Sequence, residues 1–185
     1  MNEEKPSHIL FQTFFVSREM SMSPMIVDII KFGKKLERSK LKESKYSISI
    51  SYGKRLLINA RDVDIKQMKQ QDIVEIVDYD PIKNIVLAIG KKYPCIETSV
   101  HWIVQKARHD VNAIVEISSK KLYQVCRDHL PVIAKTPCGT IDRAKAVLKT
   151  LRDSKNICIK NEGILLVGVN LKEIEDSLAK ITREI

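Results

Sequence analysis

The chain has 185 residues and a formal net charge of +9, with 44% hydrophobic and 30% charged residues. This length and composition predict one globular domain with a sizeable core. The apolar segment at residues 9–16 is far shorter than the roughly 20 residues of a membrane-spanning helix. Glu3 and Glu4 give the N-terminus the wrong charge for a signal peptide. We therefore expect a cytoplasmic protein with no membrane partner.

The most basic part of the chain is residues 31–45, which hold seven lysine and arginine side chains. Together with the apolar residues between Ile26 and Leu36, they predict an amphipathic helix with a solvated basic face. A basic face can bind nucleic acid, but no aromatic side chains alternate with the basic residues to stack on bases. Nucleic-acid binding is therefore our third interpretation, which a steep salt dependence of binding would have to support.

In the first half of the chain, the pattern predicts a helix and then paired strands. Residues 1–23 show no clear period and are interpreted as an N-terminal extension to a single domain, residues 24–185. A helix is predicted at residues 25–42. Isoleucine and serine alternate over residues 46–51, which is the period of a half-buried strand. Residues 55–59 follow a glycine turn and are expected to form the partner strand.

The second half of the chain mixes strands and helices. Residues 73–79 and 84–89 flank the turn pair Asp80-Pro81 and predict a second hairpin. Thr140 is placed to cap a helix, in which Ile141, Ala144, Leu148 and Leu151 are expected to face inward. Further helices are predicted at residues 97–108, 140–151 and 171–182, and strands at residues 113–118, 157–159 and 164–167. This order predicts an α/β layered domain around a largely antiparallel sheet flanked by helices.

Two stretches carry motifs. Residues 93–119 contain Y-P-C-I-E, a helical segment and R-H-D-V-N-A-I-V-E-I-S, and residues 157–171 contain N-E-G followed by an apolar run. In this order they resemble the class II aldolase/adducin family, which includes zinc-dependent sugar-phosphate aldolases and epimerases. The family pattern is roughly Pro-Ser-Ser-Glu, Arg-Pro-Asp-Val-Asn-Ala, His-x-His and Asn-His-Gly. The resemblance covers roughly residues 24–182 and implies the layered fold of that family.

The resemblance assigns roles to several positions. Glu97 falls on the acid/base glutamate of the family. The two zinc-binding histidines of His-x-His fall on Glu116 and Ser118, and the third zinc ligand falls on Glu162. A catalytic zinc ion is held mostly by imidazoles and keeps one open position. With all three imidazoles replaced, we expect no tight zinc binding and no metal-dependent aldol cleavage of the family type.

The substrate-binding positions of the family are altered too. The serines that help bind the substrate phosphate fall on Cys95 and Ile96, and the glycine-asparagine turn falls near residues 46–47. The Thr-Pro-Ser/Thr-Gly phosphate loop falls on residues 59–62, where Arg61 offers an electrostatic substitute. The phosphate site is therefore expected to be eroded.

The resemblance implies that Glu97, Glu116 and Glu162 converge, and close carboxylates cannot all stay ionised without a counter-charge. Three arrangements are open: a hard cation such as Mg²⁺, Mn²⁺ or Ca²⁺, a lysine or arginine from this chain or a neighbouring subunit, or glutamates that point into solvent. Our first interpretation is a catalytically degenerate member without a cofactor. It would act as a binding or structural subunit, with a protein partner or as the homotetramer usual in the family.

The second interpretation is an enzyme, an aldehyde-lyase or epimerase acting on a sugar phosphate. Glu97 would then be the acid/base residue, and Glu116 and Glu162 would hold Mg²⁺ or Mn²⁺. His101 lies four residues after Glu97 on the same helical face, where it can orient that glutamate or act as a base. The alternative for His101 is a hydrogen-bonded structural histidine.

The four cysteines are Cys95, Cys126, Cys138 and Cys158. They form no Cys-x-x-Cys pair, so a structural zinc site is not expected. Reduced thiols are the ordinary state in the cytoplasm, but a disulfide would be less surprising if the high Lys, Glu and Ile content reflects a thermophilic source.

Overall fold

The computed structural model describes residues 11–37 and 44–183. Within them a single nine-stranded sheet runs in the order β1-β5-β4-β3-β2-β6-β9-β8-β7. The β1–β5 and β7–β8 pairs are parallel and the other pairs are antiparallel. The strands are β1 (Gln12–Ser17), β2 (Lys45–Tyr52), β3 (Arg55–Asn59), β4 (Ile73–Asp80), β5 (Ile85–Ile89), β6 (Ala113–Ser118), β7 (Val132–Ile133), β8 (Asn156–Ile159) and β9 (Gly163–Gly168).

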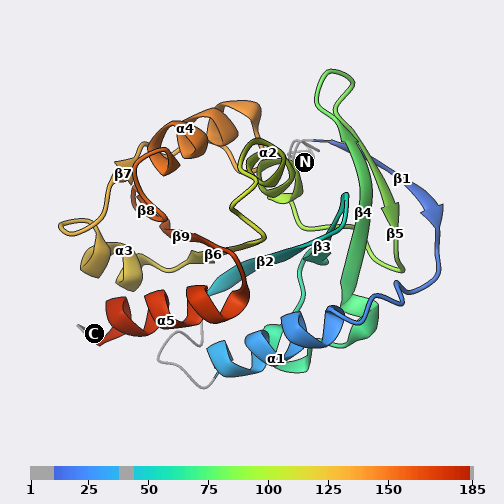
Figure 1. Ribbon diagram of the computed structural model, residues 1–185, viewed down its shortest axis with the longest axis horizontal. Coiled ribbons are helices and arrows are strands. Elements are labelled where there is room, and N and C mark those ends of the chain that lie inside the picture. Colours follow the sequence, from blue (N-terminus) through green and yellow to red (C-terminus); the bar gives the residue numbers. More distant parts are fainter. Residues whose placement is uncertain (1–10, 38–43, 184–185) are drawn as a thin grey trace, which may run out of the picture.

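Helices cover both faces of the sheet (Figure 1), which confirms the predicted layered α/β fold. On one face lie α1 (Ile26–Glu37), α3 (Lys120–Cys126) and α5 (Leu171–Thr182), and on the other lie α2 (Thr98–Ala107) and α4 (Ile141–Leu151). Two short 3₁₀ turns, Ile65–Gln67 and Gln70–Asp72, precede β4. No helix in the described part of the chain is long and apolar enough to span a membrane.

Strand β1 lies within the segment that we interpreted as an N-terminal extension. It pairs in parallel with β5, with Phe14 opposite Leu87 and Phe15 opposite Ala88. Phe11, just before the strand, is buried in the cluster formed by β3, β4 and α2. The main sheet therefore includes residues from well before position 24.

Strand β2 is buried on both faces, whereas its isoleucine-serine alternation predicted one solvated face. Ile48 and Ile50 pack into the core on the α1 side. Ser47 and Ser49, on the opposite face, are also buried. Each hydroxyl has the hydrogen-bond partner that burial requires: Ser49 Oγ bonds to His101 on α2, and Ser47 Oγ bonds to Cys95, just before α2. The serines of the alternating pattern therefore lie on a buried face of β2 and not on a face exposed to solvent.

Helix α4 begins as predicted, with the Thr140 side chain accepting a hydrogen bond from Arg143 N. Ala144 and Leu151 are buried and Leu148 is partly buried. Ile141, which we expected to face inward, is 41% exposed, and Arg143 is fully buried instead. The prediction for Ile141 was wrong because the first turn of α4 turns its arginine toward a cluster of carboxylates.

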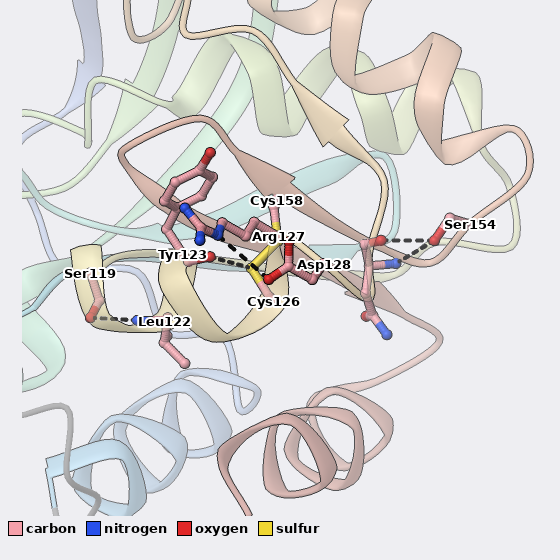
Figure 2. The surroundings of a disulfide bond; sticks show 9 residues. Ser119, Leu122, Tyr123, Cys126, Arg127, Asp128, Ser154 and Cys158 are labelled. Carbon is pink, nitrogen blue, oxygen red and sulfur yellow. Dashed lines mark hydrogen bonds and ion pairs between the residues drawn. A yellow bond between two sulfur atoms is a disulfide. The ribbon is translucent and has the colours of Figure 1, made fainter. Parts of the chain in front are cut away.

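A disulfide bond joins Cys126 at the end of α3 to Cys158 on β8 (Figure 2). For this pair the structure departs from the default of reduced thiols and has the disulfide that was left open. The bond links two segments 32 residues apart. Ser119 caps α3 by accepting a hydrogen bond from Leu122 N, as Figure 2 also shows. Cys95 and Cys138 are free thiols.

Candidate functional site

The centre of the candidate site is the guanidinium group of Arg143, which has no exposed side-chain surface. Its Nη2 lies 2.5 Å from Glu116 Oε1, and its Nη1 lies 2.8 Å from Glu162 Oε2. Its Nε forms a longer ion pair of 3.4 Å with Glu97 Oε2. The three glutamates that we expected to converge do so around a cation supplied by the same chain.

Each of these side chains is positioned by a different element. Glu97 is the N-cap residue of α2, Glu116 faces inward from the middle of β6, and Arg143 is in the first turn of α4. Glu162 lies in the tight turn between β8 and β9, where its N–H donates to Ile159 O at 2.9 Å. The cluster therefore joins the N-terminal ends of α2 and α4 to β6 and to the β8–β9 turn.

Gly163 explains why the turn that carries Glu162 can approach β6. A Cβ atom at this position would lie 1.9 Å from Ile117 O and 2.8 Å from Ser119 N. Asn161, on the other side of Glu162, has a positive φ of 58°, a conformation that asparagine tolerates better than most residues. The Asn-x-Gly sequence thus fits a turn that is pressed against the backbone of β6.

Further contacts tie the residues before α4 to the cluster. Arg143 Nη1 donates to Thr136 O at 3.0 Å, and Gly139 N donates to Glu97 Oε2 at 3.2 Å. The Lys135 ammonium lies 3.4 Å from Glu162 Oε1 and is mostly exposed. Two cationic side chains therefore face three carboxylates, and the two most buried carboxylates share Arg143.

This charge balance shifts the acid–base properties of the cluster. Burial, with the nearby Glu97 carboxylate, raises the pKa of Glu116 to about 8 although Arg143 opposes the shift. Burial alone would lower the pKa of Arg143, but Glu116 and Glu97 raise it above its ordinary value. Arg143 is therefore a permanent cation, while Glu116 takes up a proton near neutral pH.

A pocket of about 580 Å³ lies beside Glu97. It gathers positions that the family resemblance assigned to substrate binding, including Ser47, Arg61 and Cys95, together with Ser118 at a zinc-ligand position. Its size falls within the usual range for small-molecule sites. Arg143, Glu116 and Glu162 do not line it, so the ion cluster lies behind the wall that Glu97 forms.

The thiols in this pocket are weak acids. Burial raises the pKa of Cys95 to about 11, and Cys95 Sγ lies 3.0 Å from Ser47 Oγ. Burial and then the Glu97 carboxylate raise the pKa of Cys138 to about 12. Both thiols are protonated near neutral pH and are poor nucleophiles in this state.

The imidazole of His101 is fully buried and bonds to Ser49 Oγ through Nδ1 at 2.7 Å. Burial, and then the positive charge of Arg143, lower the pKa of His101 to about 3. The ring is therefore neutral at physiological pH. Nδ1 has the hydrogen bond that the structural alternative for His101 expects, whereas Nε2 is buried without a hydrogen-bond partner among the described residues.

Arg143 is the residue that sequence reasoning missed. A lysine or arginine counter-charge was among the open alternatives, but no position was assigned to it. The signal was present in the helical spacing, because Arg143, Val147 and Leu151 recur every four residues and share one buried face. A charged residue on that face had to meet a buried partner.

The family description "Class II Aldolase and Adducin N-terminal domain" matches residues 27–181. This chain belongs to the class II aldolase and adducin family. No curated protein sequence gives a significant match. The family match covers most of the residues that the structure describes.

Solved structures of class II aldolases superpose well on the chain. An L-fuculose 1-phosphate aldolase shares 24% identity with a TM-score of 0.73, covering 89% of this chain and 85% of its own. The L-fuculose-1-phosphate aldolase from Thermus thermophilus shares 19% identity with a TM-score of 0.65, covering 79% and 80%. A sugar-phosphate aldolase from Thermotoga maritima shares 13% identity with a TM-score of 0.68, covering 86% and 91%. These likenesses establish the fold.

The donor atoms of this family member do not suit the zinc ion that the family resemblance implies. Glu116 and Glu162 stand where imidazoles are expected, and each is already bound to Arg143. Ser118 is exposed and lines the pocket. In residues 11–37 and 44–183, no three histidine, cysteine or acidic side chains are arranged as a metal-binding group. We therefore derive no chemical step through a metal ion.

Proposed function

We propose that this class II aldolase/adducin family member is catalytically degenerate and acts as a binding or structural subunit. The observation that carries the proposal is the donor set at the three family ligand positions. Carboxylates stand at 116 and 162 and a hydroxyl stands at 118, and both carboxylates are bound to a buried arginine. A carbonyl or enediolate oxygen in the pocket would find no Lewis acid held by imidazoles.

The pocket beside Glu97 supports a binding role. Its walls combine the Arg61 and Lys45 side chains with two protonated thiols and apolar residues such as Ile65 and Ile96. Cys95 and Ile96 lack the hydroxyl groups that bind phosphate in the family, so we propose a ligand held by few polar contacts. Family resemblance also leads us to propose assembly as a homotetramer, with a protein partner as a further proposal.

An aldolase assay tests the proposal directly. The protein would be incubated with fuculose 1-phosphate and related sugar phosphates, with Zn²⁺, Mg²⁺ or Mn²⁺ added separately. A fuculose-phosphate aldolase serves as the positive control. We expect no cleavage and no epimerisation above the rate without protein. Metal-stimulated cleavage that is lost in Glu97→Gln would overturn the proposal and favour the lyase or epimerase interpretation.

Elemental analysis after dialysis gives a second readout. Wild type and Glu162→Ala should both contain no stoichiometric divalent metal. A stoichiometric metal in wild type that is lost in Glu162→Ala would contradict the proposal even if the substrate were not found.

A further inference from the structure

A site in which several carboxylates converge needs a cation to hold them together, because their mutual repulsion and burial both oppose folding. In this chain the cation is an arginine side chain of the same chain. The Arg143 side chain is fully buried, and its three nitrogens each face a different glutamate at 2.5–3.4 Å. We infer that Arg143 takes the structural place of the family's metal ion and makes the fold of this chain independent of divalent cations.

The shape of the guanidinium group suits this role. It is planar, always charged, and offers five N–H donors in a rigid fork. Nη1 reaches both Glu162 and the Thr136 carbonyl oxygen, and Nη2 reaches Glu116. A lysine offers one compact ammonium group, which cannot span the same set of acceptors. The inference therefore concerns the arginine side chain and not positive charge alone.

Arg143 also helps to hold in place the segment before α4, which forms one wall of the pocket. The residues just before α4 include Cys138, which lines the pocket. They are held by the Arg143–Thr136 bond, by Gly139 N donating to Glu97, and by Ser99 Oγ donating to Gly139 O at 2.5 Å. Arg143 contributes directly to the first of these bonds and fixes Glu97 for the second. Loss of the guanidinium would loosen one wall of the pocket.

The first test uses wild-type protein and its thermal midpoint, Tm. After dialysis against EDTA, Tm should be unchanged, and it should stay unchanged when Zn²⁺, Mg²⁺ or Mn²⁺ is added back. A fall in Tm with EDTA that is reversed by one of these ions would overturn the inference. This experiment needs no variant, so it decides the matter even if substitutions at position 143 fail to fold.

The second test is chemical rescue of Arg143→Ala. Removing the side chain should lower Tm, and millimolar guanidinium or methylguanidinium should restore most of the loss. Equal concentrations of sodium chloride or urea should not restore it. Arg127→Ala is the matched control, because Arg127 pairs with Asp128 at the surface and leaves no buried space. A folded Arg143→Ala protein whose Tm does not rise with guanidinium would contradict the inference.

This inference rests on the proposed function only in its statement that no metal occupies the family position. The two fail separately. Sugar-phosphate cleavage by metal-free protein would overturn the proposed function and leave the role of Arg143 intact. A Tm that depends on a divalent ion in an inactive protein would overturn the role of Arg143 alone.

Discussion

Arg143 Nη2 lies 2.5 Å from Glu116 Oε1, at the position on β6 where the family pattern has a zinc-binding histidine. The pair is buried on both sides, with 0% and 5% of the two side chains exposed. A buried ion pair adds little net stability compared with well-packed apolar residues, but breaking it by removing one partner is costly. The consequences for stability therefore depend on which partner is changed, and whether the other is changed with it.

Removal of the arginine alone should be the most damaging change in the cluster. Arg143→Met leaves Glu97 and Glu116 buried without their counter-charge, and we expect a loss of about 3–5 kcal/mol in the free energy of unfolding. Adding Glu116→Gln to this variant should recover part of the loss, because a buried amide needs neither a counter-charge nor a bound proton, whereas the Glu116 carboxyl needs one of them. Urea denaturation of both single variants and the double variant measures the coupling. Additive losses would show that the pair does not interact energetically.

The pKa of Glu116 predicts how stability depends on pH. It is raised from 4.5 to about 8 in the folded protein, so between these values the folded state holds a proton that the unfolded state has released. The free energy of unfolding should therefore fall as pH rises through this window, by at most about 1.4 kcal/mol per pH unit from this group. Glu116→Gln, which cannot lose a proton, should flatten the profile.

The measurement is the Tm of both proteins from pH 5 to pH 9 at constant ionic strength. His101, whose pKa is lowered to about 3, acts in the opposite direction because the unfolded state gains its proton as pH falls below about 6.5. Between pH 6.5 and about 8 the difference between the two profiles therefore reports Glu116, since the raised pKa values of Cys95 and Cys138 lower stability only as pH approaches 9. A wild-type profile parallel to that of Glu116→Gln would show that Glu116 is already ionised at neutral pH.

Gly163 should tolerate no side chain. In Gly163→Ala the new Cβ would meet Ile117 O at 1.9 Å, so the β8–β9 turn must move and take Glu162 with it. Gly53→Ala is the matched control, since Gly53 has φ of 58° but nothing within 4 Å of the added Cβ. We expect Gly53→Ala to cost about 1–3 kcal/mol from backbone strain alone and Gly163→Ala to cost more. Equal losses in chemical denaturation would contradict this steric explanation.

The bond between Ser49 and His101 should contribute to stability and not to pocket binding. Ser49→Ala leaves His101 Nδ1 buried without its partner at 2.7 Å, and an unsatisfied buried group costs about 1–3 kcal/mol. Ser51→Ala, where the hydroxyl is only part-buried and bonds to Gln105, should cost less. Thermal denaturation of the two variants gives the comparison. A larger loss for Ser51→Ala would show that burial does not control the effect.

Hydrophobic periodicity was enough to place most strands and helices, because their apolar faces repeat with the periods of a strand or a helix. It placed β2 but predicted the wrong exposure for one face, since Ser47 and Ser49 are buried by tertiary contacts that no local pattern reveals. It also gave no sign of β1, where Phe14 and Phe15 interrupt any alternation of apolar and polar residues. Tertiary pairing with β5 decides that Gln12–Ser17 is a strand.

The candidate site was also predicted only in part. The motif order located Glu97, Glu116 and Glu162, because the family resemblance carries the fold that brings them together. It did not locate Arg143, whose position has no counterpart among the quoted motifs. Only the helical face shared with Val147 and Leu151 pointed to it. Residues that compensate for a lost ligand thus have to be sought by burial and charge.

The parallel pairing of β1 with β5 bears on how this protein should be handled as a fragment. A piece cut at the limits of the family match, residues 27–181, would lack Gln12–Ser17 and would bare the amide and carbonyl groups along one side of β5. Uncovered strand edges recruit strands from other molecules. We expect such a fragment to aggregate. Low solubility of the truncated protein would then result from the missing edge strand and not from an unstable domain.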